Sequence, residues 1–162
     1  RMLRRQCDKS RTLLVYDEVF TGLGRTGQYT FAEYVPCDLL CLGKAFGGGF
    51  PISACIGSES VMGAWPSSTG EAIHTGTFFG HPLSCDIALA TLRELHEGKW
   101  VTRASELGQE ALSWLRAELR DEPMVREIRG IGLMLVIELT QPGYGAKLMD
   151  ILHWPADLVV KA

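Results

Sequence analysis

The sequence predicts an α/β protein whose functional site lies at one edge of a sheet. Three short apolar runs, at residues 12–16, 38–42 and 52–56, have the length and the β-branched or aromatic content of buried strands. Each run adjoins a polar or glycine-rich segment, as is typical of α/β sheets that carry their sites at the strand ends. After Pro82 the apolar residues recur at helical spacing. The chain is therefore expected to continue from this sheet into a helical region.

The first third of the chain alternates between regular elements and loops. Residues 1–9 have the composition of the end of a helix, and the run 12–16 is almost wholly apolar, which predicts a central strand covered on both faces. A glycine-punctuated loop at 21–27 separates this strand from the run 38–42, and three glycines at 47–49 precede the third run. We expect the strands to form a predominantly parallel sheet.

The last third predicts two helices and a strand. One helix begins at Pro82, where a first-turn proline is tolerated, and ends at Gly98. A second amphipathic helix is expected over 101–119. Residues 128–139 then read as one strand interrupted by glycines.

This change of pattern predicts a domain boundary near residue 96. Residues 1–96 would form part of a large domain that carries the sheet. Residues 97–162 would form part of a smaller α+β domain, since their order is helix, helix, strand.

Composition excludes several classes of protein. The chain has 162 residues and a formal net charge of −3, so no positive field exists to attract nucleic acid. No run approaches the roughly 20 apolar residues that a membrane-spanning helix needs. We expect a cytoplasmic protein without nucleic-acid or membrane partners.

The five cysteines are odd in number, contain no Cys-x-x-Cys and sit mostly in apolar segments, so we interpret them as reduced, buried thiols. The histidines His74, His96 and His153 share no spacing typical of a metal site, and no metal is expected. The chain begins with Arg1 inside an apparent helix that lacks a capping residue, which suggests a fragment.

Three polar residues stand at predicted strand ends or in the loop before the Pro82 helix. Asp17 directly follows the first apolar run, Lys44 follows the second through Gly43, and Thr77 precedes the helix. Taken singly, Asp17 fits a turn or helix cap, Lys44 a solvated amine, and the nearby glycines a flexible turn. An acid and a lysine at neighbouring strand ends nevertheless favour a shared site.

These residues belong to two longer blocks. The first reads Asp17-Glu18-Val19-x-x-Gly22-x-Gly24-Arg25-x-Gly27, followed by Asp38-Leu39-x-x-x-Gly43-Lys44-x-x-Gly47-Gly48; the second reads His74-Thr75-Gly76-Thr77-Phe78-Phe79-Gly80-His81-Pro82-Leu83. Both resemble, in order and spacing, the signature of the class III, ω-amino-acid type pyridoxal-phosphate aminotransferases. The resemblance covers roughly residues 3–150. It implies a fold type I transferase, with the second part of the large-domain sheet followed by part of the small C-terminal α+β domain.

The resemblance also implies roles for individual residues. Lys44 would bind the aldehyde of pyridoxal 5'-phosphate covalently and then carry the proton in catalysis. Asp17 would keep the pyridine nitrogen protonated, and Val19 would pack on one ring face, unless it is an ordinary core residue. Thr77 would donate to the phosphate across a homodimer interface. Phe20 stands where many relatives carry Gln, which puts the electronic tuning of the ring in question.

The implied reaction transfers an amino group from an ω-amino acid or amine, of the 4-aminobutyrate, ornithine or acetylornithine type, to a 2-oxo acid. A same-fold aminomutase or racemase would use the same Lys44 and Asp17, and an inactive oligomerisation fragment remains an alternative. The family's earlier phosphate loop, its ring-stacking aromatic residue and its C-terminal carboxylate-binding arginine have no counterpart here. Arg129 resembles a structural residue of the small domain and is left out of the site.

Overall fold

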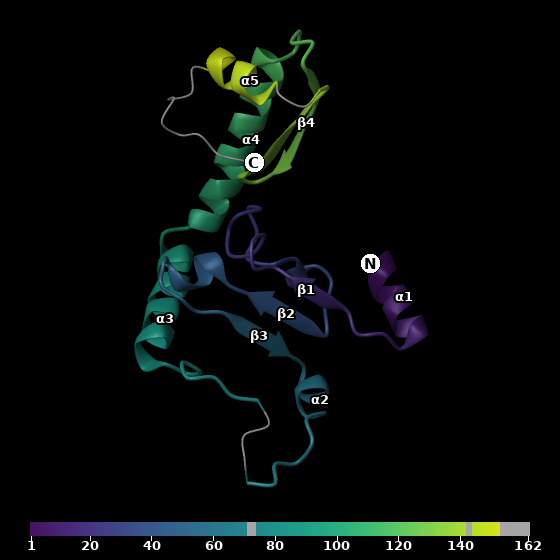
Figure 1. The fold of residues 1–162 in the computed structure, drawn as a ribbon, viewed down its shortest axis with the longest axis vertical. Coiled ribbons are helices and arrows are strands. Elements are labelled where there is room, and N and C mark those ends of the chain that lie inside the picture. The colour runs from purple at the N-terminus through teal and green to yellow at the C-terminus, as the bar shows by residue number, and fades with distance from the viewer. Residues whose placement is uncertain (71–73, 142–143, 153–162) are drawn as a thin grey trace.

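The structure, a computed structural model, describes residues 1–70, 74–141 and 144–152. Two groups of elements are joined through two successive helices (Figure 1). The first group contains α1 (Met2–Ser10), β1 (Val15–Asp17), η1 (Phe31–Glu33), β2 (Leu39–Leu42), η2 (Lys44–Gly47), β3 (Ala54–Gly57) and α2 (Glu59–Met62). The connecting helices and the second group are α3 (Pro82–Glu97), α4 (Trp100–Glu118), β4 (Val125–Ile131), β5 (Met134–Leu139) and α5 (Gly145–Ile151).

The first sheet has the strand order β1-β2-β3 and is mixed. β1 pairs with β2 in parallel, with Asp17 opposite Cys41, whereas β2 pairs with β3 antiparallel. The expectation of a predominantly parallel sheet is therefore wrong for the described strands. The connection from β2 to β3 spans residues 43–53 and includes only the single-turn helix η2, whereas parallel pairing usually needs a longer crossover. The α/β class itself is confirmed.

The first strand is less covered than its apolar sequence predicts. Leu13 and Val15 expose 53% and 49% of their surface, and β1 is one of the two edge strands of the described sheet. The expectation of a strand covered on both faces is thus wrong in the described part of the chain. Apolar composition favours burial but cannot specify which segment provides the cover.

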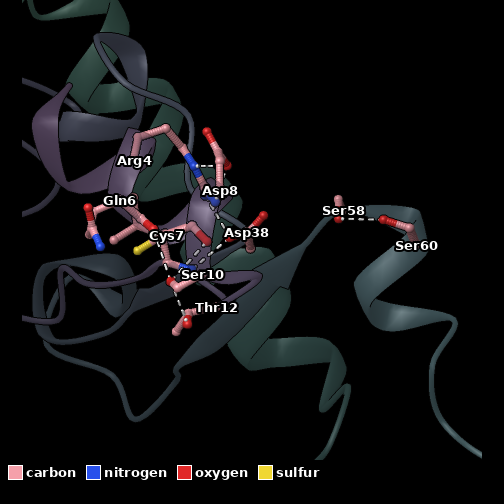
Figure 2. A network of polar contacts seen from close by, with 10 residues as sticks. Arg4, Gln6, Cys7, Asp8, Ser10, Thr12, Asp38, Ser58 and Ser60 are labelled. Carbon is pink, nitrogen blue, oxygen red and sulfur yellow. Dashed lines mark hydrogen bonds and ion pairs between the residues drawn. The ribbon is translucent and has the colours of Figure 1, made fainter.

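A carboxylate fastens α1 to the sheet. Asp38 Oδ2 lies 2.6 Å from Arg4 Nη1 of α1 and accepts the Leu14 backbone N–H at 2.7 Å, just before β1. Arg4 also pairs with Asp8 one turn later on α1 (Figure 2). The backbone hydrogen bond first, and the Arg4 guanidinium second, lower the pKa of Asp38. One side chain thus connects a helix and two strands.

The two expected long helices are present, with bounds shifted by a residue or two. Pro82 opens α3, and the chain turns at Lys99, whose φ of 54° separates α3 from α4. Along α4 the buried positions recur at helical spacing, at Val101, Ala104, Gly108 and Leu115. Figure 1 shows α4 extending from the first sheet to the β4–β5 hairpin.

The segment expected as one interrupted strand is instead an antiparallel hairpin. Gly132 has a φ of 54° and reverses the chain between β4 and β5. Leu115 and Leu119, from the end of α4, form a buried cluster with Leu148 of α5, and hairpin residues including Ile128 pack against it. Burying each leucine contributes about 1.5–3 kcal/mol. The expected α+β character of this region is therefore present, but with two strands.

The hairpin turn makes close contact with the loop after β1. Leu133 donates its N–H to the Arg25 carbonyl at 2.9 Å. A Cβ built on Gly132 would lie 2.3 Å from the Thr26 carbonyl carbon, and one built on Gly108 of α4 would lie 2.0 Å from the Gly132 oxygen. Glycine is required at both positions, because any side chain would force these backbones apart. This close backbone contact holds the glycine-rich loop after β1 against the β4–β5 hairpin.

None of the five cysteines is buried, which corrects the expectation. Cys7, Cys37 and Cys41 are partly buried, and Cys55 and Cys85 are exposed. An apolar sequence context therefore did not ensure burial of these thiols. Among the described residues, no helix combines the length and the apolar character that crossing a membrane requires. Residues 153–162, including His153 and the end of the predicted small domain, lie outside the described residues.

Candidate active site

Asp17 ends β1 with its carboxylate exposed to solvent. Its Oδ1 accepts the backbone N–H of Val19 at 3.1 Å, which stabilises the turn that follows the strand. Because β1 and β2 are parallel, this turn and the segment after β2 leave the sheet at the same edge. The strand pairing therefore places Asp17 near the beginning of the Lys44 segment.

Lys44 opens η2 in an unusual backbone conformation. Its φ is 44°, a left-handed value that costs a non-glycine residue about 1–2 kcal/mol. Its Nζ lies 4.6 Å from the centre of the Phe20 ring. No carboxylate of the described residues pairs with this amine. Strained backbone carrying an unpaired amine is typical of functional sites.

Val19 connects the two segments. A Cβ on the buried Gly43 would lie 3.2 Å from Val19 Cγ1, so this side chain packs directly beside the residue that precedes Lys44. Val19 is partly buried. Asp17, Val19 and Lys44 thus lie at one sheet edge, where the sequence predicts Asp17, Lys44 and Thr77 together.

Glu18 has a structural role that was not predicted from the sequence. Its side chain is only 3% exposed, and its carboxylate accepts hydrogen bonds from the Phe31 N–H at 2.7 Å and the Thr21 hydroxyl at 3.3 Å. The Glu18 carbonyl also accepts the Gly22 N–H at 3.0 Å. Glu18 therefore shapes the loop that follows the site. A second acid directly after Asp17 at a strand end was the available signal.

An open cavity of about 470 Å³ lies beside Lys44. Val19, Phe20 and Lys44 line one side, and Trp100 and Leu107 of α4 line another. Its walls are mainly apolar, but Lys44, Arg25 and Arg103 contribute positive charge. A cavity with apolar walls and a few cationic groups suits a flat organic anion.

Thr77 does not join this cluster. It lies in the exposed segment before α3 and does not line the cavity beside Lys44. Its neighbours Phe78 and Phe79 expose 76% and 62% of their surface. The structure thus brings together three of the four predicted site residues within one chain.

Arg129 is occupied by two ion pairs. Its Nη1 lies 2.7 Å from Glu127 on the same strand, β4, and 2.9 Å from Glu138 on β5, so only the second pair joins the two strands. These contacts agree with its exclusion from the site. The described residues contain no group of three or more His, Cys, Asp or Glu side chains that could hold a metal ion.

Comparison with known protein families shows which family contains this sequence. Residues 1–155 match the aminotransferase class-III family. The chain belongs to this family. An ornithine aminotransferase of Bacillus anthracis is 40% identical over 139 residues, which are 84% of this chain and 34% of that protein. An acetylornithine aminotransferase of Methanosarcina mazei is 39% identical over 142 residues, covering 86% and 34%.

Solved class-III aminotransferase structures share the fold. The structure of Plasmodium falciparum ornithine δ-aminotransferase superposes with a TM-score of 0.77 at 38% identity, covering 85% of this chain and 35% of that one. An (S)-enantioselective ω-transaminase from Thermomicrobium roseum gives a TM-score of 0.79 at 31% identity, covering 86% and 32%. The expected family and its fold type I architecture are confirmed. This chain spans about a third of the length of these relatives.

Proposed function

We propose that this chain is the lysine-bearing part of a pyridoxal 5'-phosphate-dependent transaminase. The complete enzyme would move an amino group from an ω-amino acid or amine to a 2-oxo acid. Membership in the class-III aminotransferase family and the ornithine and acetylornithine aminotransferases among its relatives support this proposal. The observation that carries it is that Asp17, Val19 and Lys44 lie at one sheet edge, where Val19 and Lys44 line the cavity.

The chemistry of these side chains fits the cofactor. An unpaired primary amine suits its aldehyde, an exposed carboxylate suits a protonated ring nitrogen, and an aliphatic side chain between them suits a ring face. A relative from Toxoplasma gondii is described with partial occupancy of PLP at its active site. When bound, the cofactor supplies an electron sink for the substrate carbon.

Each residue then has a distinct task. Lys44 anchors the cofactor and afterwards accepts and returns the proton of the substrate carbon through Nζ. Arginine cannot replace it, because a guanidinium stays protonated. Asp17 holds the proton on the ring nitrogen, and its bond from the Val19 N–H keeps the carboxylate oriented. Val19 limits the position of the ring from one side.

Thr77 is proposed as a phosphate ligand of the neighbouring subunit in a homodimer. Its absence from the lining of the Lys44 cavity and the exposed Phe78 and Phe79 that directly follow it support this arrangement, since exposed aromatic residues are common at interfaces. Division into a large-domain part, 1–96, and a small-domain part, 97–162, belongs to the same proposal, as does a location in the cytoplasm.

Titration of the chain with pyridoxal phosphate tests the proposal. We expect a visible absorption band that disappears on borohydride reduction, because the imine becomes a stable secondary amine, and the resulting covalent label should map by peptide mass spectrometry to Lys44. Lys44→Arg is the matched control, because it keeps the charge beside Phe20 and cannot react with an aldehyde. Labelling spread evenly over other lysines, or unchanged in Lys44→Arg, would contradict the proposed role.

A further inference from the structure

We propose that Cys41 and Cys55 form a thiol pair that is oxidised to an intrachain disulfide. This bond would join β2 to β3, the two strands that flank the Lys44 segment in the chain. The two cysteines are directly opposite each other in the antiparallel β2–β3 pair. Their pairing depends on strand register alone, so the inference stands whether or not the chain binds pyridoxal phosphate.

The backbone geometry favours close approach of these side chains. The Cys41 carbonyl accepts the Glu18 N–H at 2.9 Å, on the β1 side, so its backbone groups point away from β3. Cys41 and Cys55 are therefore a non-hydrogen-bonded pair of the antiparallel ladder. Such pairs have Cα atoms about 4.5 Å apart, inside the range of about 4.4–6.8 Å that disulfides adopt.

The surroundings give the two thiols different roles. Cys55 is exposed and open to an oxidant, whereas Cys41 is partly buried. Burial first, and then the neighbouring Cys55 thiol, raise the pKa of Cys41. Cys55 is therefore the thiol that reacts with the oxidant, and Cys41 is the thiol that resolves the product.

Oxidised glutathione is a sufficient oxidant. The Cys55 thiolate attacks one glutathione sulfur, which breaks the glutathione disulfide and releases one glutathione thiolate. The Cys41 thiolate then attacks Cys55 Sγ, forms the Cys41–Cys55 bond and releases the second glutathione. Two electrons pass from the cysteines to glutathione, and the two cysteine protons end on the two glutathione thiols.

The position of the bond relates it to the site. β2 leads into the Lys44 segment and β3 receives the chain after it, so the disulfide would close the loop 42–54. Cys41 also lies opposite Asp17 in the β1–β2 pair. The thiol pair thus occupies the same row of the sheet as the proposed cofactor-binding carboxylate.

Incubation of the chain with oxidised glutathione, followed by alkylation and peptide mass spectrometry, tests the inference. We expect a peptide linked through Cys41 and Cys55, with the loss of two free thiols, reversed by dithiothreitol. In the Cys41→Ser variant the reaction should stop at glutathionylated Cys55. The Cys55→Ser variant should give neither glutathionylated Cys55 nor the linked peptide. Cys85→Ser, which removes another exposed thiol, should leave the link unchanged.

Three results would overturn the inference. These are a parent chain that stops at mixed disulfides, a link that joins Cys41 to Cys37 instead, and a Cys41–Cys55 link seen only after urea unfolds the chain. The measurement on the parent chain decides the question even where a variant fails to fold.

Discussion

The Lys44 ammonium lies over the face of the Phe20 ring, 4.6 Å from its centre. This contact joins the turn after β1 to the segment after β2, the same two segments that Val19 and Gly43 bring together. A cation is attracted to the negative face of an aromatic ring without being neutralised. Phe20 therefore holds the Lys44 side chain beside the cavity without a hydrogen bond or an ion pair to its nitrogen.

A double-mutant cycle measures this contact. Phe20→Leu and Lys44→Met each remove one partner, and the double variant removes both. We expect a coupling free energy of about 0.5–1 kcal/mol in urea unfolding, the usual range for an exposed cation–π pair. Phe20→Tyr, which keeps the ring face, should retain the coupling. Additive effects of the two single substitutions would show that the contact contributes nothing to stability.

Asp17→Asn separates the charge of Asp17 from its role in the turn. The amide oxygen can still accept the Val19 N–H, so folding and cofactor binding should be retained. The neutral side chain cannot keep the ring nitrogen protonated, and we expect amino transfer in the complete polypeptide to slow by roughly 10²-fold. Single-turnover absorbance with bound cofactor measures this rate. Asp17→Ala is the comparison that loses both functions, and parent-like turnover in Asp17→Asn would remove Asp17 from the mechanism.

The sequence predicted the elements well because local signals determine them. The apolar runs became β1, β2 and β3, and the proline and glycine at its ends bounded α3. The polar residues at the ends of β1 and β2 also came together, since parallel pairing brings strand ends to one edge.

Features that depend on strand pairing, or on burial by segments that are distant in the sequence, were not predictable in this way. Gly132 was expected to interrupt a strand, yet its left-handed conformation turns the strand back on itself. Exposure of Val15 depends on segments that local sequence does not specify. Glu18 was overlooked because its partners, Phe31 and Thr21, are found only when the loop has folded.

Gly132→Ala should weaken the contact between the hairpin and the glycine-rich loop. The added Cβ would meet the Thr26 carbonyl carbon at 2.3 Å, and the φ of 54° disfavours alanine. We expect a loss of at least ~2 kcal/mol in the free energy of unfolding, from backbone strain and overpacking together. Gly145→Ala is the matched control, because a Cβ there meets nothing within 4 Å. Equal stability of the two variants would show that the close approach is not needed.

Asp38→Asn should remove a pH-dependent contribution to stability. The Leu14 N–H and the Arg4 guanidinium lower the pKa of Asp38 in the folded chain. A carboxylate with a lowered folded pKa stabilises the fold above its unfolded pKa of about 3.9, and this contribution is lost as the pH falls through the folded value. The parent should therefore be more stable than the variant at neutral pH, and the difference should shrink in acid.

Urea unfolding of the parent and Asp38→Asn between neutral and acid pH measures that difference. Asp8→Asn is the control, because Asp8 contacts the same Arg4 but its side chain is 61% exposed, and exposed helix pairs contribute little. We expect only the Asp38 substitution to flatten the acid limb of the stability curve. The two carboxylates differ in their hydrogen-bond partners. Asp38 accepts a backbone N–H as well as contacting Arg4, whereas the Asp8 side chain contacts only Arg4 among the described residues. Parallel acid limbs for parent and Asp38→Asn would mean that Asp38 does not link α1 to the sheet through its charge.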